Sequence, residues 1–243
     1  MKGFQLKFLP FNERSILVEL PSRIEEDVLK DVLLFKNKIR KNLSKVIVEV
    51  IQSYNSLLVV YSLTIDDFNS EILNLKSLYE SQVDDVNLES LVWEIPVCYD
   101  TKFGLDLNEI SEEKKLTIQE VIQLHSQPFY MVYFIGFLPG FLYLGGLDHQ
   151  LQFPRKSKPR MKVEKGAVAI GGHQTGIYPN ESPGGWNIIG NSPLEFFNPQ
   201  QSPPCFVKAG DQVQFVPIDI LEYEKIKRDV GFGVYQPKFR KRL

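Results

Sequence analysis

Cysteine is scarce in this chain of 243 residues, long apolar runs are missing, and neither sign of charge dominates. The two cysteines, Cys98 and Cys205, form no close pair, so we expect small buried side chains rather than a disulfide framework or a zinc finger. No stretch approaches the roughly 20 apolar residues that a membrane span needs, and residues 1–5 lead into no signal-peptide pattern. We therefore expect a cytoplasmic protein with no membrane partner.

The charges are nearly balanced, with 28 basic and 30 acidic residues and a net charge of −2. A general nucleic-acid surface is usually strongly basic, so we expect no nucleic-acid partner, and any anion site must be local. The histidines at 125, 149 and 173 show no close ligand spacing, which predicts no metal site. His125 continues the apolar stripe of a predicted helix and is expected to be a hydrogen-bonded core residue, while His149 is expected to be exposed.

The first part of the chain alternates between apolar strands and amphipathic helices. The pattern predicts a hairpin of residues 4–9 and 15–20, followed by a helix over 24–39. Two strands, at 46–51 and 57–63, and a second helix over 68–79 come next. The first helix has apolar residues at three- and four-residue steps: Ile24, Val28, Val32, Phe35 and Ile39. The polar stretch 81–87 has no sustained period, which predicts a domain boundary there and a small α+β domain over residues 1–88.

Glycine is concentrated in the second part, where 11 of the 16 glycines lie between residues 136 and 190. Glycines this frequent predict many turns and few long helices. We predict two helices, at 106–113 and 117–126, and the second has Thr117 and Glu120 in capping-box register. We also predict short strands at 91–99, 129–134, 168–170, 186–189, 194–197 and 212–216. An all-β barrel or sandwich with an inserted helix over residues 89–243 fits this pattern, with a solvated basic tail at 238–242.

Residues 136–148, with the sequence GFLPGFLYLGGLD, alternate backbone-permissive residues with aromatic ones. Such a loop can bring main-chain N–H groups close to a ligand, which makes Pro139, Gly140 and Phe141 candidate binding residues. The glycine spacing matches neither a Walker loop nor a dinucleotide fingerprint. A pair of tight turns in a β-rich domain explains the same pattern without a ligand.

Residues 154–165 carry six basic side chains and one acidic side chain, a local charge of +5. Arg155 and Arg160 each follow a proline, which places a guanidinium group at the start of extended backbone, suited to a carboxylate or a phosphate. A solvated basic hairpin is the alternative for the lysines of this segment. The pair Met161-Lys162 lacks the Ala-Met-Lys-Met form of a biotin acceptor, so we expect no biotin attached to this chain.

Residues 171–187 gather amide, hydroxyl, phenol, imidazole and indole groups around five glycines. Aromatic side chains with a few convergent polar atoms are typical of small-molecule sites. The residues of this segment that we expect to orient a planar amide are His173, Gln174, Thr175, Tyr178 and Asn187. Trp186 and Asn187 are candidates for binding the substrate or a phosphate. Glu181 is the only carboxylate in the segment that can serve as an acid or a base.

Taken in this order, these segments resemble the B subunit of prokaryotic 5-oxoprolinase. The motifs that carry the resemblance are GFLPGF at 136–141, the Pro-Arg pairs at 154–155 and 159–160, QTGIYP at 174–179 and SPGGW at 182–186. The same family is also described as allophanate hydrolase subunit 1 and as the KipI-type inhibitor of a sporulation histidine kinase. The resemblance extends over nearly the whole chain, including residues 120–126 and 204–217.

The resemblance implies a small N-terminal α+β domain followed by a cyclophilin-like β-barrel. It also implies ATP-dependent hydrolysis of the lactam of 5-oxoproline to L-glutamate, carried out together with A and C subunits, with ATP bound by the assembled complex. Arg155 and Arg160 would then hold the substrate carboxylate or a phosphate, and Gln174, Thr175 and Tyr178 would position the amide. We expect no catalytic role for His173, which stands where the family pattern has a small or variable residue, and no prolyl isomerase activity, because fold alone does not give it.

Two other functions are compatible with the same resemblance. A KipI-like protein would inhibit a sensor histidine kinase by gripping its helical dimerisation domain and would need no catalytic pocket. A carboxyltransferase half of a urea or amide carboxylase would act beside biotin-dependent partners. Neighbouring genes for A and C subunits would favour the oxoprolinase role over both.

Overall fold

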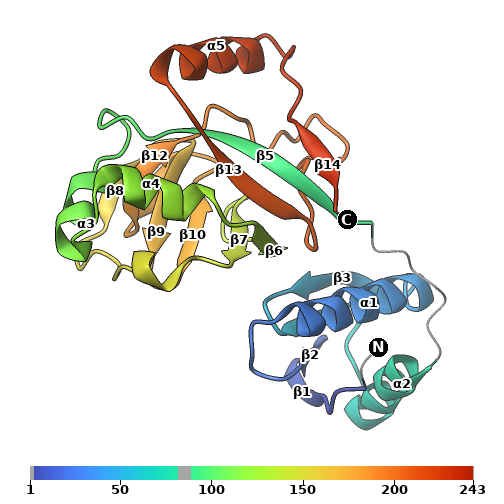
Figure 1. Ribbon diagram of the computed structural model, residues 1–243. Coiled ribbons are helices and arrows are strands. Elements are labelled where there is room, and N and C mark those ends of the chain that lie inside the picture. The colour runs from blue at the N-terminus through green and yellow to red at the C-terminus, as the bar shows by residue number, and fades with distance from the viewer. Residues whose placement is uncertain (1–2, 82–88, 243) are drawn as a thin grey trace. The chain divides into compact units, whose positions relative to one another are not determined.

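The computed structural model describes residues 3–81 and 89–242, and the chain divides into two compact units, residues 1–88 and 89–243 (Figure 1). Residues 82–87 of the predicted boundary stretch lie outside the described residues. Separate hydrophobic clusters fill the two units, so each is stabilised by apolar contacts of its own.

The first unit is a four-stranded antiparallel sheet with two helices. Its elements are β1 (Lys7–Asn12), β2 (Ser15–Glu19), α1 (Glu26–Asn42), β3 (Ile47–Gln52), β4 (Ser56–Tyr61) and α2 (Phe68–Glu80). The strands lie in the order β1-β2-β4-β3, and the predicted hairpin is confirmed by the pairing of β1 with β2. Alternate residues of β4 are buried, so the core lies on one face of the sheet.

The buried stripe of α1 is the one that the sequence predicts: Val28, Val32, Phe35 and Ile39 are fully buried. Ile24 was expected to belong to this stripe, but it is 56% exposed. The reason is that α1 begins only at Glu26, so Ile24 precedes the helix and does not share its periodicity.

The second unit contains most of the strands. Its elements are β5 (Leu91–Cys98), α3 (Leu107–Lys114), α4 (Ile118–Ser126), β6 (Tyr130–Ile135), β7 (Leu142–Gly145), the 3₁₀ turn η1 (His149–Leu151), β8 (Arg160–Val163), β9 (Ala167–Gly171), β10 (Gln174–Ile177), β11 (Ser182–Gly184), β12 (Asn187–Asn191), β13 (Gln212–Ile218), α5 (Ile220–Gly231) and β14 (Phe239–Lys241). The capping box at the start of α4 is confirmed, with Thr117 and Glu120 each bonding the other's backbone.

The main sheet of the second unit nearly closes on itself. Its strands follow the order β10-β9-β12-β5-β13-β6-β7, and β7 and β10, the two ends of this path, also contact each other. The pair β5 and β13 is parallel, and every other pair of neighbouring strands on this path is antiparallel. Strands β8 and β11 form a separate two-stranded pair. Of the predicted barrel or sandwich with an inserted helix, the barrel is therefore confirmed.

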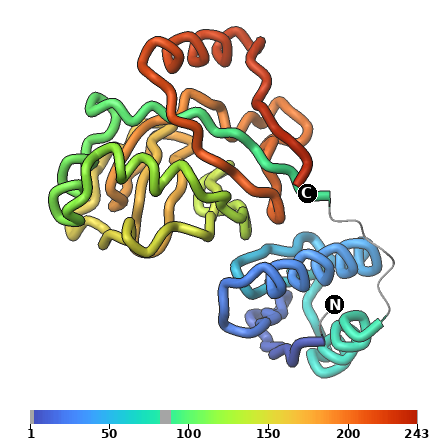
Figure 2. The backbone as a smooth tube through the Cα atoms, viewed as in Figure 1, coloured from blue at the N-terminus to red at the C-terminus, as the bar shows by residue number. Residues whose placement is uncertain are grey.

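The second unit differs from the prediction in three places. Residues 194–197 form no strand, although Leu194 and Phe196 fill the core, because an irregular segment can bury apolar side chains as well as a strand can. Helix α5 was not predicted. The tail was expected to be solvated, and residues 239–241 are exposed as predicted, but they also form strand β14, which pairs with β5, and Phe239 packs against Trp93 with ring centroids 4.9 Å apart. Figure 2 shows the chain returning from α5 to run beside β5.

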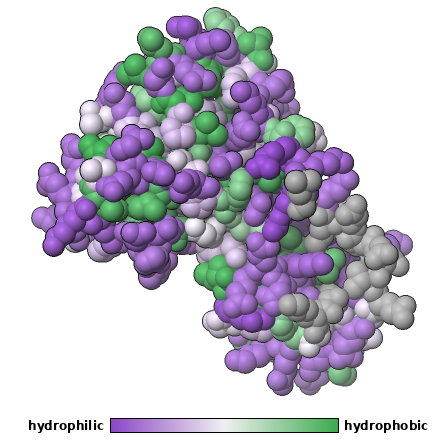
Figure 3. All heavy atoms as spheres, in the orientation of Figure 1, coloured by the Kyte–Doolittle hydropathy of each residue, from purple (hydrophilic) through white to green (hydrophobic). Residues whose placement is uncertain are grey.

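The visible face of each unit is mostly hydrophilic, with small hydrophobic areas separated by polar side chains (Figure 3). Scattered apolar residues of this kind are normal for a protein surface. Within residues 3–81 and 89–242, no helix is both long and apolar enough to cross a membrane.

Candidate functional site

Aromatic side chains from two of the predicted segments meet in one cluster of the second unit. The ring of Phe141 lies 5.8 Å from that of Tyr178 and 5.7 Å from that of Trp186, and both pairs are edge-to-face. Tyr178 and Trp186 complete the triangle at 6.5 Å. All three are buried, together with Val163, Ala167, Ala169 and Ile188. The fold thus brings together predicted site residues that are far apart in the chain.

Two glycines make room for these rings. A Cβ atom at Gly171 would lie 2.5 Å from the indole of Trp186, and one at Gly184 would lie 2.4 Å from the hydroxyl of Tyr178. Contacts that short do not occur, so any side chain at either position would displace an aromatic ring. Two of the five glycines in the segment 171–187 therefore serve the packing of aromatic side chains.

The loop before Phe141 holds a strained residue. Phe137 has a φ of 64° and is 69% exposed, and Gly140 has a φ of 85°. A Cβ at Gly140 would also lie 2.7 Å from that of Phe197. The left-handed conformation suits glycine but costs a phenylalanine energy, and such strain often marks functional loops. Pro139 is exposed in the same loop.

Arg155 covers the outer side of the aromatic cluster. Its guanidinium carbon lies 5.6 Å from the centre of the Trp186 ring, a cation–π distance, and the residue is exposed. Burial raises the pKa of the Tyr178 phenol, against the opposing effects of the Trp186 backbone and of the Arg155 and Arg160 charges. At neutral pH Tyr178 is therefore a hydrogen-bond donor, not a phenolate base.

A buried carboxylate that sequence reasoning missed organises the charges beside this cluster. Asp106 accepts hydrogen bonds from Arg160 Nη2 at 2.7 Å and from the Ile188 N–H at 2.7 Å, and Lys156 Nζ lies 2.9 Å away. Burial alone would raise the pKa of Asp106, but these hydrogen bonds from Arg160, Lys156 and Ile188 hold it below its ordinary value. In the sequence, Asp106 was visible only as the start of a helix.

Arg160 and Asn187 are tied to neighbouring groups. Arg160 donates to Asp106 through Nη2, while its Nη1 is buried without a hydrogen-bond partner in the described part of the chain. Asn187 Nδ2 donates to the carbonyls of Pro154 at 2.8 Å and Ile170 at 3.2 Å, while its Oδ1 is buried and likewise unpaired there. Asn187 therefore fixes the strand that follows Trp186.

Thr175 is held inside the barrel. It is 1% exposed, its hydroxyl donates to the Ala169 carbonyl at 3.1 Å, and His125 Nε2 lies 2.8 Å from its Oγ1. His125 is fully buried and bonded on both ring nitrogens, which confirms the expected core role. Complete burial lowers the pKa of His125 to about 3, so the imidazole is neutral at physiological pH. His149 is exposed, as predicted.

The remaining predicted residues lie nearer the surface. Gln174 begins β10 and is half-buried, and His173 is exposed in the turn before it. Glu181 is exposed and forms an ion pair with Lys162 at 2.8 Å. The predicted catalytic residues Gln174, Thr175, Tyr178 and Glu181 are thus divided between the barrel interior, the aromatic cluster and the surface.

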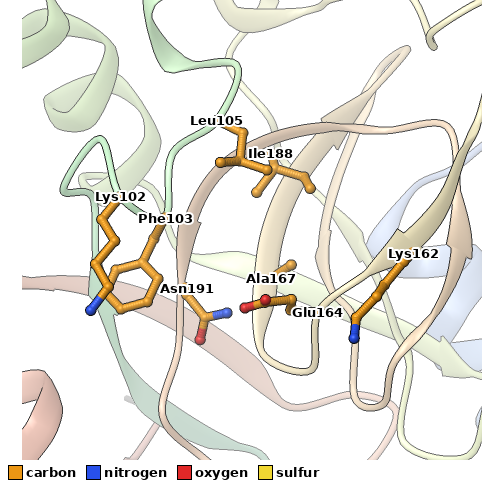
Figure 4. A pocket seen from close by; sticks show the side chains of 8 residues that line it. All are labelled: Lys102, Phe103, Leu105, Lys162, Glu164, Ala167, Ile188 and Asn191. Carbon is orange, nitrogen blue, oxygen red and sulfur yellow. The ribbon is translucent and has the colours of Figure 1, made fainter.

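A cavity of about 210 Å³ lies beside the aromatic cluster, and Figure 4 shows the side chains that line it. Its lining residues come from the loop after β5, from β8 and the turn after it, and from β9 and β12; they are Lys102, Phe103, Leu105, Lys162, Glu164, Ala167, Ile188 and Asn191. Ala167 and Ile188 belong to both the cavity wall and the aromatic cluster. None of the lining residues was a predicted site residue. Lys162 and Glu164 belong to the basic segment 154–165, and the other lining residues come from distant segments and meet them only in the folded chain.

The comparisons with known proteins agree on one family. The model of the carboxyltransferase domain, subdomain C and D, matches residues 6–207. The 5-oxoprolinase B subunit of Bacillus subtilis (strain 168) is 38% identical over 192 residues, which cover 75% of this chain and 80% of the relative. The 5-oxoprolinase B subunit of Haemophilus influenzae is 37% identical over 212 residues, covering 87% and 97%.

Two solved structures extend the comparison to longer chains. TTHA0988 is matched with a TM-score of 0.73 and 32% identity over 85% of this chain, which spans only 40% of TTHA0988. The urea carboxylase of Kluyveromyces lactis is matched with a TM-score of 0.81 and 20% identity over 98% of this chain, which spans 24% of that enzyme. The second likeness supports the fold alone, and with it the expected cyclophilin-like barrel.

Proposed function

The chain belongs to the carboxyltransferase-domain family that includes the B subunits of 5-oxoprolinase, and we propose that it is the B subunit of a complex that hydrolyses the lactam of 5-oxoproline to L-glutamate with ATP. The observation that carries this proposal is the similarity to two proteins of that name over most of both chains. The names of these relatives further support partners, which we propose to be homologues of the A and C subunits.

The chemistry explains why ATP and several subunits are needed. A lactam is a poor electrophile, so we propose that its oxygen takes the γ-phosphoryl group of ATP, which releases ADP and activates the ring carbon. One water then adds to that carbon, and the C–N bond breaks with the electron pair leaving on nitrogen. A second water hydrolyses the resulting acyl phosphate to glutamate and phosphate. Stabilising the charge that develops in these steps is the task of the protein.

This chain is proposed to supply part of that site. Its glycines match no Walker loop, so ATP is proposed to bind in the assembled complex and to meet exposed cations of this chain. Arg155 is the best-placed group, because its guanidinium is fixed over Trp186 and still reaches solvent. Gln174 and the neutral Tyr178 are proposed to position the amide, whereas Thr175 acts from inside the barrel by holding β10.

The match of residues 6–207 to the carboxyltransferase domain supports one alternative, a carboxyltransferase role in a urea or amide carboxylase. Such an enzyme would transfer a carboxyl group from biotin that is carried by another domain. The two functions differ in substrate and in cofactor, so one assay separates them.

The test is reconstitution. The chain is co-expressed with its A and C homologues, and glutamate formed from 5-oxoproline is measured with and without ATP, and with this chain omitted. ATP-dependent glutamate that disappears when this chain is omitted supports the proposal. A well-folded complex that forms no glutamate, but carboxylates urea or an amide when biotin carboxylase and carrier are added, favours the alternative.

A further inference from the structure

The cavity beside the aromatic cluster has rigid apolar walls. Ala167 and Ile188 are nearly fully buried, so the floor of the cavity cannot shift without disturbing the cluster. Phe103 forms a wall whose ring packs on Tyr223 with centroids 4.4 Å apart. At about 210 Å³ the cavity is smaller than the roughly 300–1,000 Å³ of pockets that hold drug-sized ligands, which suits a compact ring.

A fixed amide lies at the base of the cavity. Asn191 is buried, its Oδ1 accepts a hydrogen bond from the Tyr223 hydroxyl at 2.9 Å, and its Nδ2 donates to the Lys165 carbonyl at 3.0 Å. These contacts settle which end of the amide is nitrogen, and they use one of the two hydrogens on Nδ2. The second hydrogen is a donor suited to a ligand carbonyl oxygen.

Charged groups of both signs surround this amide. Figure 4 shows Glu164 and Asn191 pointing toward one another, with Lys102 and Lys162 on opposite sides of the cavity. Lys162 pairs with Glu181 at the surface, where both side chains are more than half exposed. Exposed ion pairs contribute little free energy, so Lys162 can turn to a ligand carboxylate at small cost. Glu164 supplies an acceptor for a ligand N–H.

From this arrangement we infer that the cavity binds a small cyclic amide that carries a carboxylate. The ring packs between Phe103 and Ile188, the ring carbonyl accepts from Asn191 Nδ2, and the ring N–H donates to Glu164. The carboxylate pairs with Lys162 or Lys102. The inference rests on the proposed function for its natural ligand, 5-oxoproline. It assigns recognition of the lactam to the cavity in place of Gln174 and Tyr178, while Arg155 keeps its proposed role toward a phosphate.

The first experiment measures binding by titrating the purified full chain with 5-oxoproline and following the protein's NMR signals. Two variants change the cavity. Glu164→Gln removes the charge of the acceptor, and Leu105→Trp fills the mouth of the cavity. Leu105 is 59% exposed, so a larger side chain there disturbs no core. Matched controls are Glu195→Gln, at an exposed pair with Lys165, and Leu221→Trp, on the outside of α5.

We expect the dissociation constant to rise by about tenfold or more in both cavity variants, because Glu164→Gln weakens a charge-assisted hydrogen bond and Leu105→Trp takes up the space of the ligand. In the controls it should rise by less than about twofold. 2-Pyrrolidinone, which lacks the carboxylate, and L-proline, which lacks the ring carbonyl, should each bind about tenfold more weakly or worse. Equal affinity in the cavity variants and the controls would overturn the inference.

The reconstituted complex separates this inference from the proposed function. If the complex turns over 5-oxoproline and both cavity variants keep the parent KM, the function stands and the cavity is not the substrate site. If the chain binds 5-oxoproline in the cavity but the complex forms no glutamate, the binding site stands and the proposed reaction fails. A rise in KM for Glu164→Gln and Leu105→Trp, absent from the controls, supports both.

Discussion

Nε2 of His125 in α4 lies 2.8 Å from Oγ1 of Thr175 in β10. Since the Thr175 hydroxyl donates to the Ala169 carbonyl, its oxygen accepts from Nε2–H, and Nδ1 of the neutral ring then accepts from the Tyr99 hydroxyl at 2.7 Å. The ring also stacks on Phe215 with centroids 4.4 Å apart. This imidazole joins a helix to two strands of the barrel, so its protonation is linked to folding.

The first prediction is that the protein loses stability in mild acid through His125. Burial lowers the pKa of His125 to about 3, while the unfolded chain titrates near 6.5, so between these values the unfolded chain binds the proton more tightly. Stability is then full above about pH 6.5 and falls by up to about 1.4 kcal/mol for each pH unit below it. Urea unfolding at about pH 7.5 and about pH 5 measures this loss, which should be about 2 kcal/mol.

The control variants for this prediction are His125→Gln and His149→Gln. His125→Gln should lower stability at both pH values and flatten the dependence on pH. His149 is exposed, so its replacement should leave the dependence unchanged. An unchanged pH dependence in the His125→Gln variant would assign the acid sensitivity to other groups.

The second prediction concerns the carboxylate that pairs with Arg160 and Lys156. Asp106→Asn keeps the shape of the side chain but leaves Arg160 without its counter-charge and Lys156 with only the exposed Glu109, so we expect the free energy of unfolding to fall by about 3 kcal/mol. Glu109→Gln removes an exposed partner of Lys156 and should cost less than about 1 kcal/mol. Urea unfolding of both variants tests this; similar losses would contradict a special role for Asp106.

A third prediction concerns the stability of the first unit. Lys38 is buried, and its ammonium group donates to the carbonyls of Leu78, Tyr79 and Ser81 at the end of α2, a helix with no basic residue in its last turn. Lys38→Met leaves these carbonyls without that donor and should destabilise the unit by about 1–3 kcal/mol. Hydrogen exchange of α2 amides measures the loss directly. Lys30→Met, at an exposed position on the same helix as Lys38, should change little.

The sequence was sufficient wherever the determining interactions are local. The spacing of Val28, Val32 and Phe35 indicates the helix that buries them, and Thr117 with Glu120 indicates the start of α4, because these contacts span one or two turns. The glycine- and proline-rich segments correctly predicted a β-rich second unit.

Contacts between distant residues account for what the sequence did not reveal. Asp106 meets Arg160 and Ile188, which are 54 and 82 positions away, so its role depends on the finished fold. The same holds for the tail, which becomes strand β14 only because β5 offers an edge to pair with. Of the predicted site, Phe141, Tyr178 and Trp186 do come together, but the cavity beside them is lined by residues from separate segments that only folding unites.

The last prediction tests the exposed guanidinium on the aromatic cluster. Arg155→Ala removes a cation held 5.6 Å above the Trp186 ring, and because the residue is exposed, thermal stability should change little. If the cation holds a phosphate, kcat/KM of the reconstituted complex should fall by about tenfold or more, the cost of a charge-assisted contact. Arg155→Lys should recover only part of the activity, because an ammonium group lacks the planar fork that stacks on an indole and bonds an oxyanion twice. Lys158→Ala, at an exposed lysine of the same segment, is the matched control. Equal kinetics in the Arg155→Ala and Lys158→Ala variants would show that the segment contributes only general positive charge.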